Sequence, residues 1–179
     1  AAGFKATSNV EIARELGIVA GGTTGHEHTQ RHFGDRAAFC AVRDSVAGEV
    51  TFLLDTYSTR SCGLPTAIDV MRETPDRICS IRFDSEETME GDYLLGVHAF
   101  REAGIEAPIN LGGGFNADFT RRFEALRNFV EWPAHLQRYM YGQYLVEPHV
   151  PLPTRGEVGA VYKVSQSGDR PPMKFSDIP

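Results

Sequence analysis

Short apolar runs alternate along the chain with longer stretches whose apolar positions recur at helical spacing. Three runs are nearly continuous, VTFLLDTY at 50–57, ICSIRFDS at 78–85 and APINLGGGF at 107–115. Such runs are typical of strands buried on both faces of a parallel sheet. Weaker strand patterns lie at 3–7, 18–27 and 138–146. The pattern therefore predicts about six strands, each followed by a helix or a long connection.

The stretches between these runs carry recognisable helix start and stop signals. Ser8 and Glu11 have the spacing of a capping box, and Gly17 and Gly104 are placed to end helices. Pro75 ends another helical stretch. The expected helices cover 8–17, 35–46, 63–73, 86–104 and 116–130.

This alternation predicts an α/β fold with a mostly parallel sheet, either open or closed into a barrel. Polar residues and glycines gather where the expected strands end, which in a β/α barrel is the face that carries the active site. No internal repeat or low-complexity linker interrupts the chain. We expect a core at 1–150 that carries these strand ends, and a loop with a hairpin-like extension at 151–179 packed on it.

Composition narrows the class of protein. The 179 residues are 41% hydrophobic and 23% charged, with a formal net charge of −6. These values are typical of a soluble domain and argue against general nucleic-acid binding, which requires a basic surface. Three scattered cysteines without CxxC spacing fit a reducing compartment. No stretch reaches the roughly 20 apolar residues of a membrane span. We therefore expect a cytoplasmic protein.

Half of the six histidines lie in GGTTGHEHTQRHFG at 21–34. His26 and His28 form an HxH pattern after a strand, which occurs in metal-dependent barrel hydrolases, and His28 and His32 are spaced to share a helix face. The stretch is also consistent with the polar first turn of a helix. A third interpretation, which we favour, is one functional histidine, His26, with His28 and His32 as its neighbours in the first turn of that helix. The other histidines do not follow expected strands, so the metal ligands remain unknown.

Acidic residues follow two of the buried runs, Asp55 after the first and Asp84 after the second. Such a carboxylate binds a sugar hydroxyl, Mg²⁺ or a neighbouring arginine, and Arg82 points to the same face as Asp84. The glycines at 112–114 would let a phosphate approach backbone N–H groups ahead of a helix. Arg155 is a lone loop arginine, which is usually surface charge.

Seven stretches, taken in order, resemble the nicotinate phosphoribosyltransferase family. They are GFKATSNVEIARELGI, GTTGHEH, FLLDTYST, SIRFDS, GGGFNAD, YGQYLV and TRGEVGAVYKVS. The resemblance runs over nearly the whole chain, and the shared order makes it specific. It implies the irregular α/β barrel of the type II phosphoribosyltransferases, incomplete in this chain, with a small C-terminal β addition.

The resemblance also implies an activity. The family joins nicotinate to phosphoribosyl pyrophosphate, giving nicotinate mononucleotide and pyrophosphate in NAD salvage, with Mg²⁺ and coupled ATP hydrolysis. His26 resembles the histidine that ATP phosphorylates, and Asp55 and Asp84 resemble the acidic residues near the ribose and metal. Arg82 resembles the arginine that meets the substituent of the pyridine ring. The positions that resemble phosphate-binding ones are Gly112, Gly114, Gly142 and Arg155.

Ser8 bears on the choice of substrate. Relatives that use nicotinamide are expected to carry Asp at this place, which accepts from an amide, whereas Ser8 can donate to the carboxylate of nicotinate. Ser8 would otherwise only cap a helix. Gly113 and Tyr144 depart from the family pattern, where an acidic residue and a glycine are common. These departures bear on the ribose and phosphate contacts.

The chain also lacks segments that resemble the family's N-terminal domain, and relatives complete the site across a dimer interface. We therefore expect a homodimer, or association with a chain that supplies the missing domain. Two other functions remain open. One is a metal-dependent hydrolase that uses His26 and His28, and the other is a non-catalytic fragment that binds nucleotide.

Overall fold

The computed structural model describes residues 3–142, 145, 166 and 168–170. Its strands are β1 (Ala6–Thr7), β2 (Val19–Ala20), β3 (Val50–Leu53), β4 (Cys79–Phe83), β5 (Ile109–Leu111) and β6 (Gln137–Tyr139). Its α-helices are α1 (Val10–Leu16), α2 (His26–Arg31), α3 (Asp35–Ser45), α4 (Leu64–Glu73), α5 (Met89–Ala103) and α6 (Ala117–Phe129). A π-helix, η1 (Thr59–Gly63), and a 3₁₀ turn, η2 (Ala134–Leu136), complete the set.

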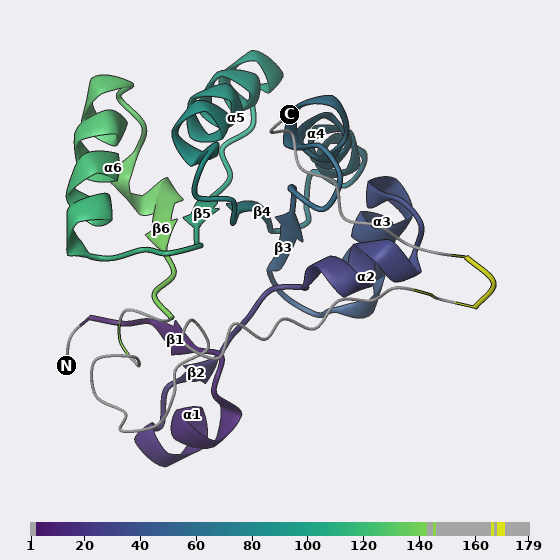
Figure 1. Ribbon diagram of the computed structural model, residues 1–179, viewed down its shortest axis with the longest axis horizontal. Helices are drawn as coiled ribbons and strands as arrows, with labels where there is room; N and C mark the ends of the chain where they lie inside the picture. Colours follow the sequence, from purple (N-terminus) through teal and green to yellow (C-terminus); the bar gives the residue numbers. More distant parts are fainter. Residues whose placement is uncertain (1–2, 143–144, 146–165, 167, 171–179) are drawn as a thin grey trace.

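The four longer β/α units share one parallel sheet. Its strand order, β3-β4-β5-β6, follows the order along the chain. Helices α3 to α6 form an arc on one side of it (Figure 1). This arrangement confirms the expected α/β class and the parallel sheet. Successive β/α units in a barrel are also ordered in this way, but closure into a barrel and the type II assignment stay predictions.

The two faces of the sheet differ in chemistry. Strand residues on the helix side are mostly apolar and buried, such as Phe52, Ile81 and Ile109, and the Phe39 ring of α3 stacks on Phe52 with centroids 4.7 Å apart. The register places the opposite side chains in rows across the sheet. That second set is mainly polar and comprises Thr51, Ser80, Arg82, Asn110 and Arg138, with Leu53 as its apolar member.

The polar face is tied together by its own side chains. The hydroxyls of Thr51 and Ser80 lie 2.8 Å apart in a hydrogen bond, and the Asn110 amide donates to the Ile81 carbonyl at 3.0 Å. Buried polar groups are tolerated when they are hydrogen-bonded in this way. The sheet therefore has an apolar side that binds its helices and a polar side that faces away from them.

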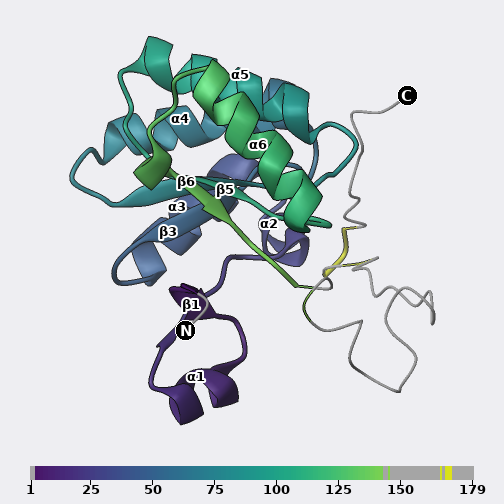
Figure 2. The ribbon, with the colours of Figure 1, turned by 90° about the vertical axis from the view of Figure 1, so that its left-hand side faces the viewer.

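A smaller unit precedes the main sheet. Strands β1 and β2 pair in parallel around α1, and this unit lies apart from the four-stranded sheet (Figure 2). Gly17 ends α1 in the left-handed conformation with φ of 63°, as the sequence predicts. The expected capping role of Ser8 is wrong, because Asn9 is the N-cap. The Asn9 side chain accepts from the Ile12 N–H at 3.0 Å, and Ser8 is exposed.

The three weaker strands are all shorter than the apolar pattern indicates, and of residues 3–7 only β1 is strand. Of residues 18–27, only β2 is strand, because the glycine-rich segment leaves the sheet and α2 begins at His26. The strand expected at 138–146 is β6, which ends at Tyr139. The C-terminal extension expected at 151–179 lies almost wholly outside the described residues, and the division of domains stays a prediction.

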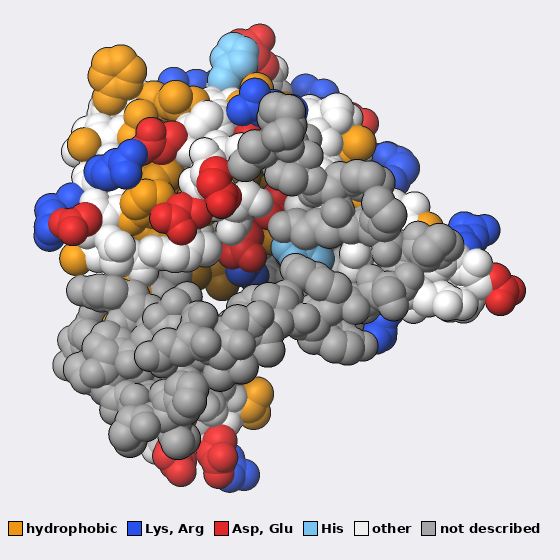
Figure 3. Space-filling view, viewed as in Figure 1, with side chains coloured by type: hydrophobic (Ala, Val, Ile, Leu, Met, Phe, Trp, Pro, Cys, Tyr) orange, Lys and Arg blue, Asp and Glu red, His pale blue; other side chains and the backbone are white. Residues whose placement is uncertain are grey.

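The surface of the protein carries both acidic and basic side chains. Acidic and basic side chains are interspersed over the visible upper part of the molecule (Figure 3), and several form ion pairs between elements, such as Arg122 with Glu90. Within the described ranges, none of the helices combines the length and the apolar character that crossing a bilayer requires.

Candidate active site

The predicted site residues of β3, β4 and β5 meet at the carboxyl ends of these strands. Asp84 directly follows β4 and Gly112 directly follows β5, while Asp55 lies two residues beyond the end of β3. A Cβ atom on Gly112 would lie 3.0 Å from Asp84 Oδ1 and 3.2 Å from Arg82 Nε. Parallel strands in register therefore bring three segments, distant in sequence, to one place.

Arg82 and Asp84 form the centre of this place. The Arg82 Nη2 atom donates to Asp84 Oδ1 at 2.7 Å, and its Nη1 atom donates to the Thr23 hydroxyl. Both side chains are mostly buried, with 19% and 26% of their surfaces exposed. Arg82 Nε is buried and has no hydrogen-bond partner within the described part of the chain. The pair expected from the sequence is thus present, with one donor still to be satisfied.

Asp55 is held from a neighbouring strand. The Ser85 hydroxyl, directly after Asp84, donates to Asp55 Oδ2 at 2.6 Å. Asp55 is buried, with 7% of its surface exposed. A hydrogen bond from a fixed hydroxyl orients this carboxylate toward one position.

His26 stands apart from the other two histidines of its stretch. It is the first residue of α2, and its Nδ1 atom lies 3.1 Å from the hydroxyl of Thr56. His28 Nε2 instead bonds the Ala38 carbonyl of α3 at 3.0 Å, and His32 Nδ1 bonds the His28 carbonyl at 2.8 Å. The sequence placed His28 and His32 in the first turn of the helix. His28 lies there, but His32 is the residue that caps the C-terminal end of α2.

A metal-binding cluster does not emerge from these residues. Among the described residues, no group of three or more His, Cys, Asp or Glu side chains could hold a metal ion. The rings of His28 and His32 pack against each other with centroids 4.4 Å apart, and each gives a nitrogen to a backbone carbonyl. These two histidines therefore stabilise α2 and its junction with α3.

The glycine run after β5 is required by the close approach of its backbone to the strand-end carboxylates. Gly113 has φ of 71°, and a Cβ there would lie 2.2 Å from the Asp84 carbonyl oxygen. A Cβ on Gly114, whose φ is 72°, would lie 2.6 Å from the Glu86 carboxylate. The run leads to α6, whose N-cap residue Asn116 accepts from the Phe119 N–H. The loop thus presents backbone beside a helix N-terminus, where anions bind well.

Two predicted substrate-binding residues are not joined to this group, and a third lies outside the described residues. Ser8 lies on the small unit and Gly142 is exposed beyond β6, and no hydrogen bond or ion pair described for the chain connects either of them to Arg82, Asp84 or His26. Arg155 lies outside the described residues.

Sequence reasoning missed the hydroxyl residues that hold the site. Thr23 bonds Arg82, Thr56 bonds His26 and Ser85 bonds Asp55. Thr56 and Ser85 directly follow Asp55 and Asp84, so a hydroxyl after each strand-end acid was the available signal. Serine and threonine are too common for that signal to be specific.

A fourth residue that the sequence did not single out is Asp35, the first residue of α3. Only 5% of its surface is exposed, and its Oδ1 atom has no hydrogen-bond partner within the described ranges. Burial raises the pKa of the Asp35 carboxyl to about 6. Its charge also adds to the burial that raises the pKa of Tyr57, which follows β3. The effect on Tyr57 places Asp35 near the segment that follows β3, which also carries Asp55.

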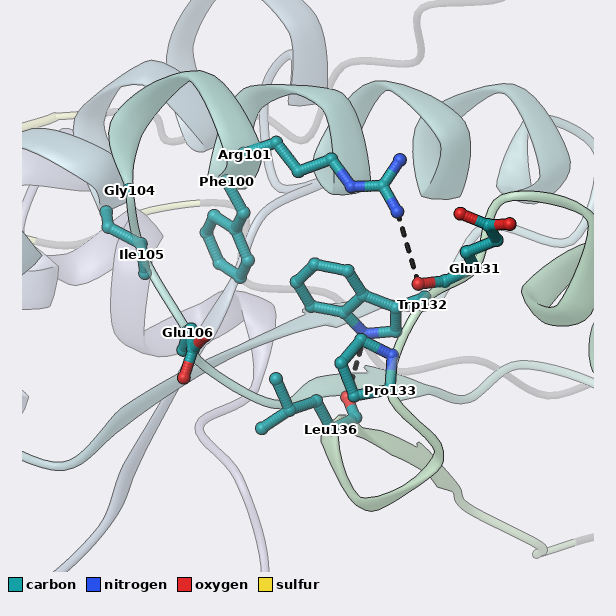
Figure 4. A pocket seen from close by; sticks show the side chains of 9 residues that line it. All are labelled: Phe100, Arg101, Gly104, Ile105, Glu106, Glu131, Trp132, Pro133 and Leu136. Atoms are coloured by element: carbon teal, nitrogen blue, oxygen red, sulfur yellow. Dashed lines mark hydrogen bonds between the residues drawn. The ribbon is translucent and has the colours of Figure 1, made fainter.

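A pocket of about 320 Å³ lies elsewhere, between the end of α5 and the segment that leads into β6 (Figure 4). Phe100, Trp132 and Leu136 supply its apolar wall. Its two side-chain donors are already engaged, because Arg101 donates to the Val130 and Glu131 carbonyls and the Trp132 indole donates to the Leu136 carbonyl at 3.3 Å. The pocket is therefore a packed junction, and we place the candidate site at the carboxyl ends.

Comparison with known proteins supports part of the resemblance seen in the sequence. No protein-family model matches the chain. The nicotinate phosphoribosyltransferase of Bacillus subtilis (strain 168) is 39% identical over 85 residues, which cover 46% of this chain and 17% of that protein. The chain therefore spans 17% of the length of this curated relative. Over that stretch, the chain is similar to a phosphoribosyltransferase that acts on nicotinate.

Proposed function

We propose that the protein takes part in an ATP-coupled nicotinate phosphoribosyltransferase reaction, which joins nicotinate to phosphoribosyl pyrophosphate. The observation that carries the proposal is the mostly buried Arg82–Asp84 pair, packed against the glycine run after β5. This pair gives a planar cation and a carboxylate next to backbone that an anionic phosphate can approach. The similarity to the Bacillus subtilis enzyme agrees with this chemistry.

The carboxylates have a direct use in such a reaction. Positive charge develops at the anomeric carbon as pyrophosphate leaves, and fixed negative groups stabilise it. Asp55 and Asp84 lie at adjacent strand ends, each oriented by a hydrogen bond, from Ser85 and Arg82. Orientation before the reaction avoids reorganisation while the charge develops.

The donor set also fits Mg²⁺. This ion prefers oxygen ligands and is commonly held by one or two carboxylates together with substrate phosphates. Asp55 and Asp84 would hold it, and the bound ion would stabilise charge on the departing diphosphate. We give His28 and His32 no such role, because one ring nitrogen of each bonds a backbone carbonyl.

Two donors to the nicotinate carboxylate would set the choice of substrate. Arg82 Nε is a buried donor without a described partner, and it would pair with that carboxylate. We propose that Ser8 favours the acid over the amide by donating to it, from a neighbouring copy of the chain or after closure of the small unit.

The three cysteines are free, and we place the reaction in the cytoplasm. Gly112, Gly114, Gly142 and Arg155 are proposed phosphate contacts.

His26 is the proposed phosphoryl acceptor from ATP. An imidazole can take a phosphoryl group and release it, which divides ATP hydrolysis into covalent steps. The expected complete site includes a second copy or a further segment, because the chain spans 17% of the relative's length. A non-catalytic fragment that binds nucleotide remains the alternative that this partial length favours.

The test compares His26→Ala with His32→Ala, using formation of nicotinate mononucleotide with and without ATP. We expect His26→Ala to lower ATP-coupled turnover at least about a hundredfold, because the covalent step is lost. His32→Ala, the matched control on the same helix, should keep most of the activity. Equal behaviour of the two variants would contradict the role of His26. Absence of product from the wild type, with retained nucleotide binding, would favour the non-catalytic alternative.

A further inference from the structure

The hydroxyl of Thr56 bonds His26 from a fully buried position. None of the Thr56 surface is exposed, and its Oγ1 atom lies 3.1 Å from His26 Nδ1. A buried hydroxyl without a partner costs free energy, so this bond contributes to the structure as well as to the histidine. The two residues are 30 positions apart in sequence, and the bond links the start of α2 to the end of β3.

The segment that carries Thr56 is fixed on both sides. Before it, the Leu54 N–H continues the sheet by bonding the Arg82 carbonyl at 3.3 Å. After it, the Ser58 carbonyl accepts from the N–H groups of Cys62 and Gly63 in η1. A Cβ on Gly63 would lie 2.1 Å from the Leu54 carbonyl oxygen, so η1 packs directly against the strand end. Thr56 is therefore a rigid anchor.

His26 has much weaker local support. It begins a helix of six residues whose N-cap, Gly25, makes no side-chain cap. A residue at the start of so short a helix has little from its own element to set the direction of its ring. The bond to Thr56 comes from a different, fixed segment and restrains the direction of the ring.

We propose that Thr56 is a positioning residue that orients the His26 ring for phosphoryl transfer, an inference that rests on the proposed function. In that step a ring nitrogen of His26 donates its electron pair to the γ-phosphorus of ATP. The N–P bond forms, the P–O bond to ADP breaks, and its electron pair leaves on the ADP oxygen. Transfer needs the nitrogen in line with the bond that breaks, so a ring free to turn would react more slowly.

The kinetic test uses Thr56→Val, which keeps the shape and removes the hydroxyl, and Thr56→Ser, which restores it. Thr51→Val is the matched control, since it removes a hydroxyl bond to Ser80 from β3, the strand that precedes Thr56. Phosphoenzyme formation is followed with ATP labelled in the γ-phosphate. We expect Thr56→Val to be slowed about 10–100-fold with an unchanged KM for nicotinate. The rate for Thr56→Ser should lie within about threefold of the wild-type rate. The rate for Thr51→Val should equal the wild-type rate.

A rate for Thr56→Val within about twofold of wild type would overturn the proposal. So would an equal loss in Thr56→Val and Thr56→Ser, since the hydroxyl would then not be the cause. If the wild type forms no phosphoenzyme, the proposed function fails, and a readout independent of activity decides the role of Thr56.

That readout is the ¹⁵N spectrum of the protein labelled in its histidines, in which a signal lost in His26→Ala identifies His26. We expect Thr56→Val to shift the Nδ1 signal of His26, Thr56→Ser to return it, and the other histidines to stay unchanged. Such a result supports positioning even without turnover. An unchanged Nδ1 signal in Thr56→Val contradicts the bond on which the proposal rests.

Discussion

The amino and carboxyl ends of the strands in the main sheet differ in how their polar side chains are hydrogen-bonded. At the amino ends, Trp132 and Phe100 are buried, and the nearby Arg101 guanidinium is occupied by backbone carbonyls. At the carboxyl ends, Arg82 and Asp84 are held in place by other side chains, yet Arg82 Nε has no described partner. The first end satisfies its side-chain donors, Arg101 and Trp132, with backbone carbonyls. The second orients its polar groups and leaves capacity for a ligand, which is how stability and chemistry are separated in β/α folds.

Replacement of Trp132 is expected to give the largest change in stability. The indole is 4% exposed, packs on Phe100 with ring centroids 6.2 Å apart, and donates to the Leu136 carbonyl. Trp132→Ala should lower the free energy of unfolding by about 3–5 kcal/mol, measured by urea denaturation, because the cavity cannot fill. Nucleotide binding per folded molecule should not change, since the carboxyl-end contacts are untouched.

Trp132→Phe is the control for this variant. It keeps most of the apolar volume and loses the indole donor, so we expect a cost of about 1–2 kcal/mol. A Trp132→Ala protein that is fully stable but has lost ligand binding would reverse the assignment of the two ends.

Glycine substitutions compare the two ends at similar backbone geometry. Gly113 and Gly104 both have positive φ, 71° and 65°. A Cβ on Gly113 would collide with the Asp84 carbonyl oxygen, whereas a Cβ on Gly104 would have no atom within 4 Å. Gly104→Ala should cost about 1 kcal/mol, from conformation alone. Gly113→Ala should cost about 2–4 kcal/mol and weaken phosphate binding, because the loop must move away from Asp84.

Thermal unfolding and the affinity for inorganic phosphate, measured on both variants, check this comparison. Equal losses of stability with unchanged phosphate affinity would show that the glycine run has no part in the site.

The sequence predicts the sheet well because its signals are local. The apolar runs that became β3, β4 and β5, and the glycines that end α1 and α5, are set by burial and backbone conformation within a few residues. The strand-end position of Asp55 and Asp84 follows from the same pattern. The predicted N-cap at Ser8 is wrong, since Asn9, one residue later, takes the capping role.

Contacts between segments are a different matter. The bond from Thr56 to His26 spans 30 positions, and the bond from Arg82 to Thr23 spans 59. Nothing local distinguishes these threonines from others, because their partners are chosen by the fold. The same holds for Asp35, whose burial depends on neighbours from other elements and which reads in sequence as an ordinary first-turn acid.

Replacement of Asp35 is expected to give a small change of the opposite sign, a gain in stability, and it tests whether the carboxyl end contains a group that lowers the stability of the fold. Its folded pKa is raised by burial from 3.8 to about 6. Between these values the folded state holds the proton more tightly than the unfolded state does. Stability therefore falls as the pH rises from about 4 to about 6, and stays lower above that. Asp35→Asn removes the charge at nearly constant shape.

We expect Asp35→Asn to be more stable than wild type by about 1–2 kcal/mol at pH 8, because the cost of burying the charge exceeds the attraction of the α3 N-terminus that is lost. At pH 4 the difference should nearly vanish, since Asp35 is then protonated in the folded protein. Urea denaturation of both proteins at the two pH values isolates this group, because all other titrations are shared. A variant that is less stable at pH 8 would mean that the charge of Asp35 stabilises the fold, and the carboxyl end would then be as well satisfied as the amino end.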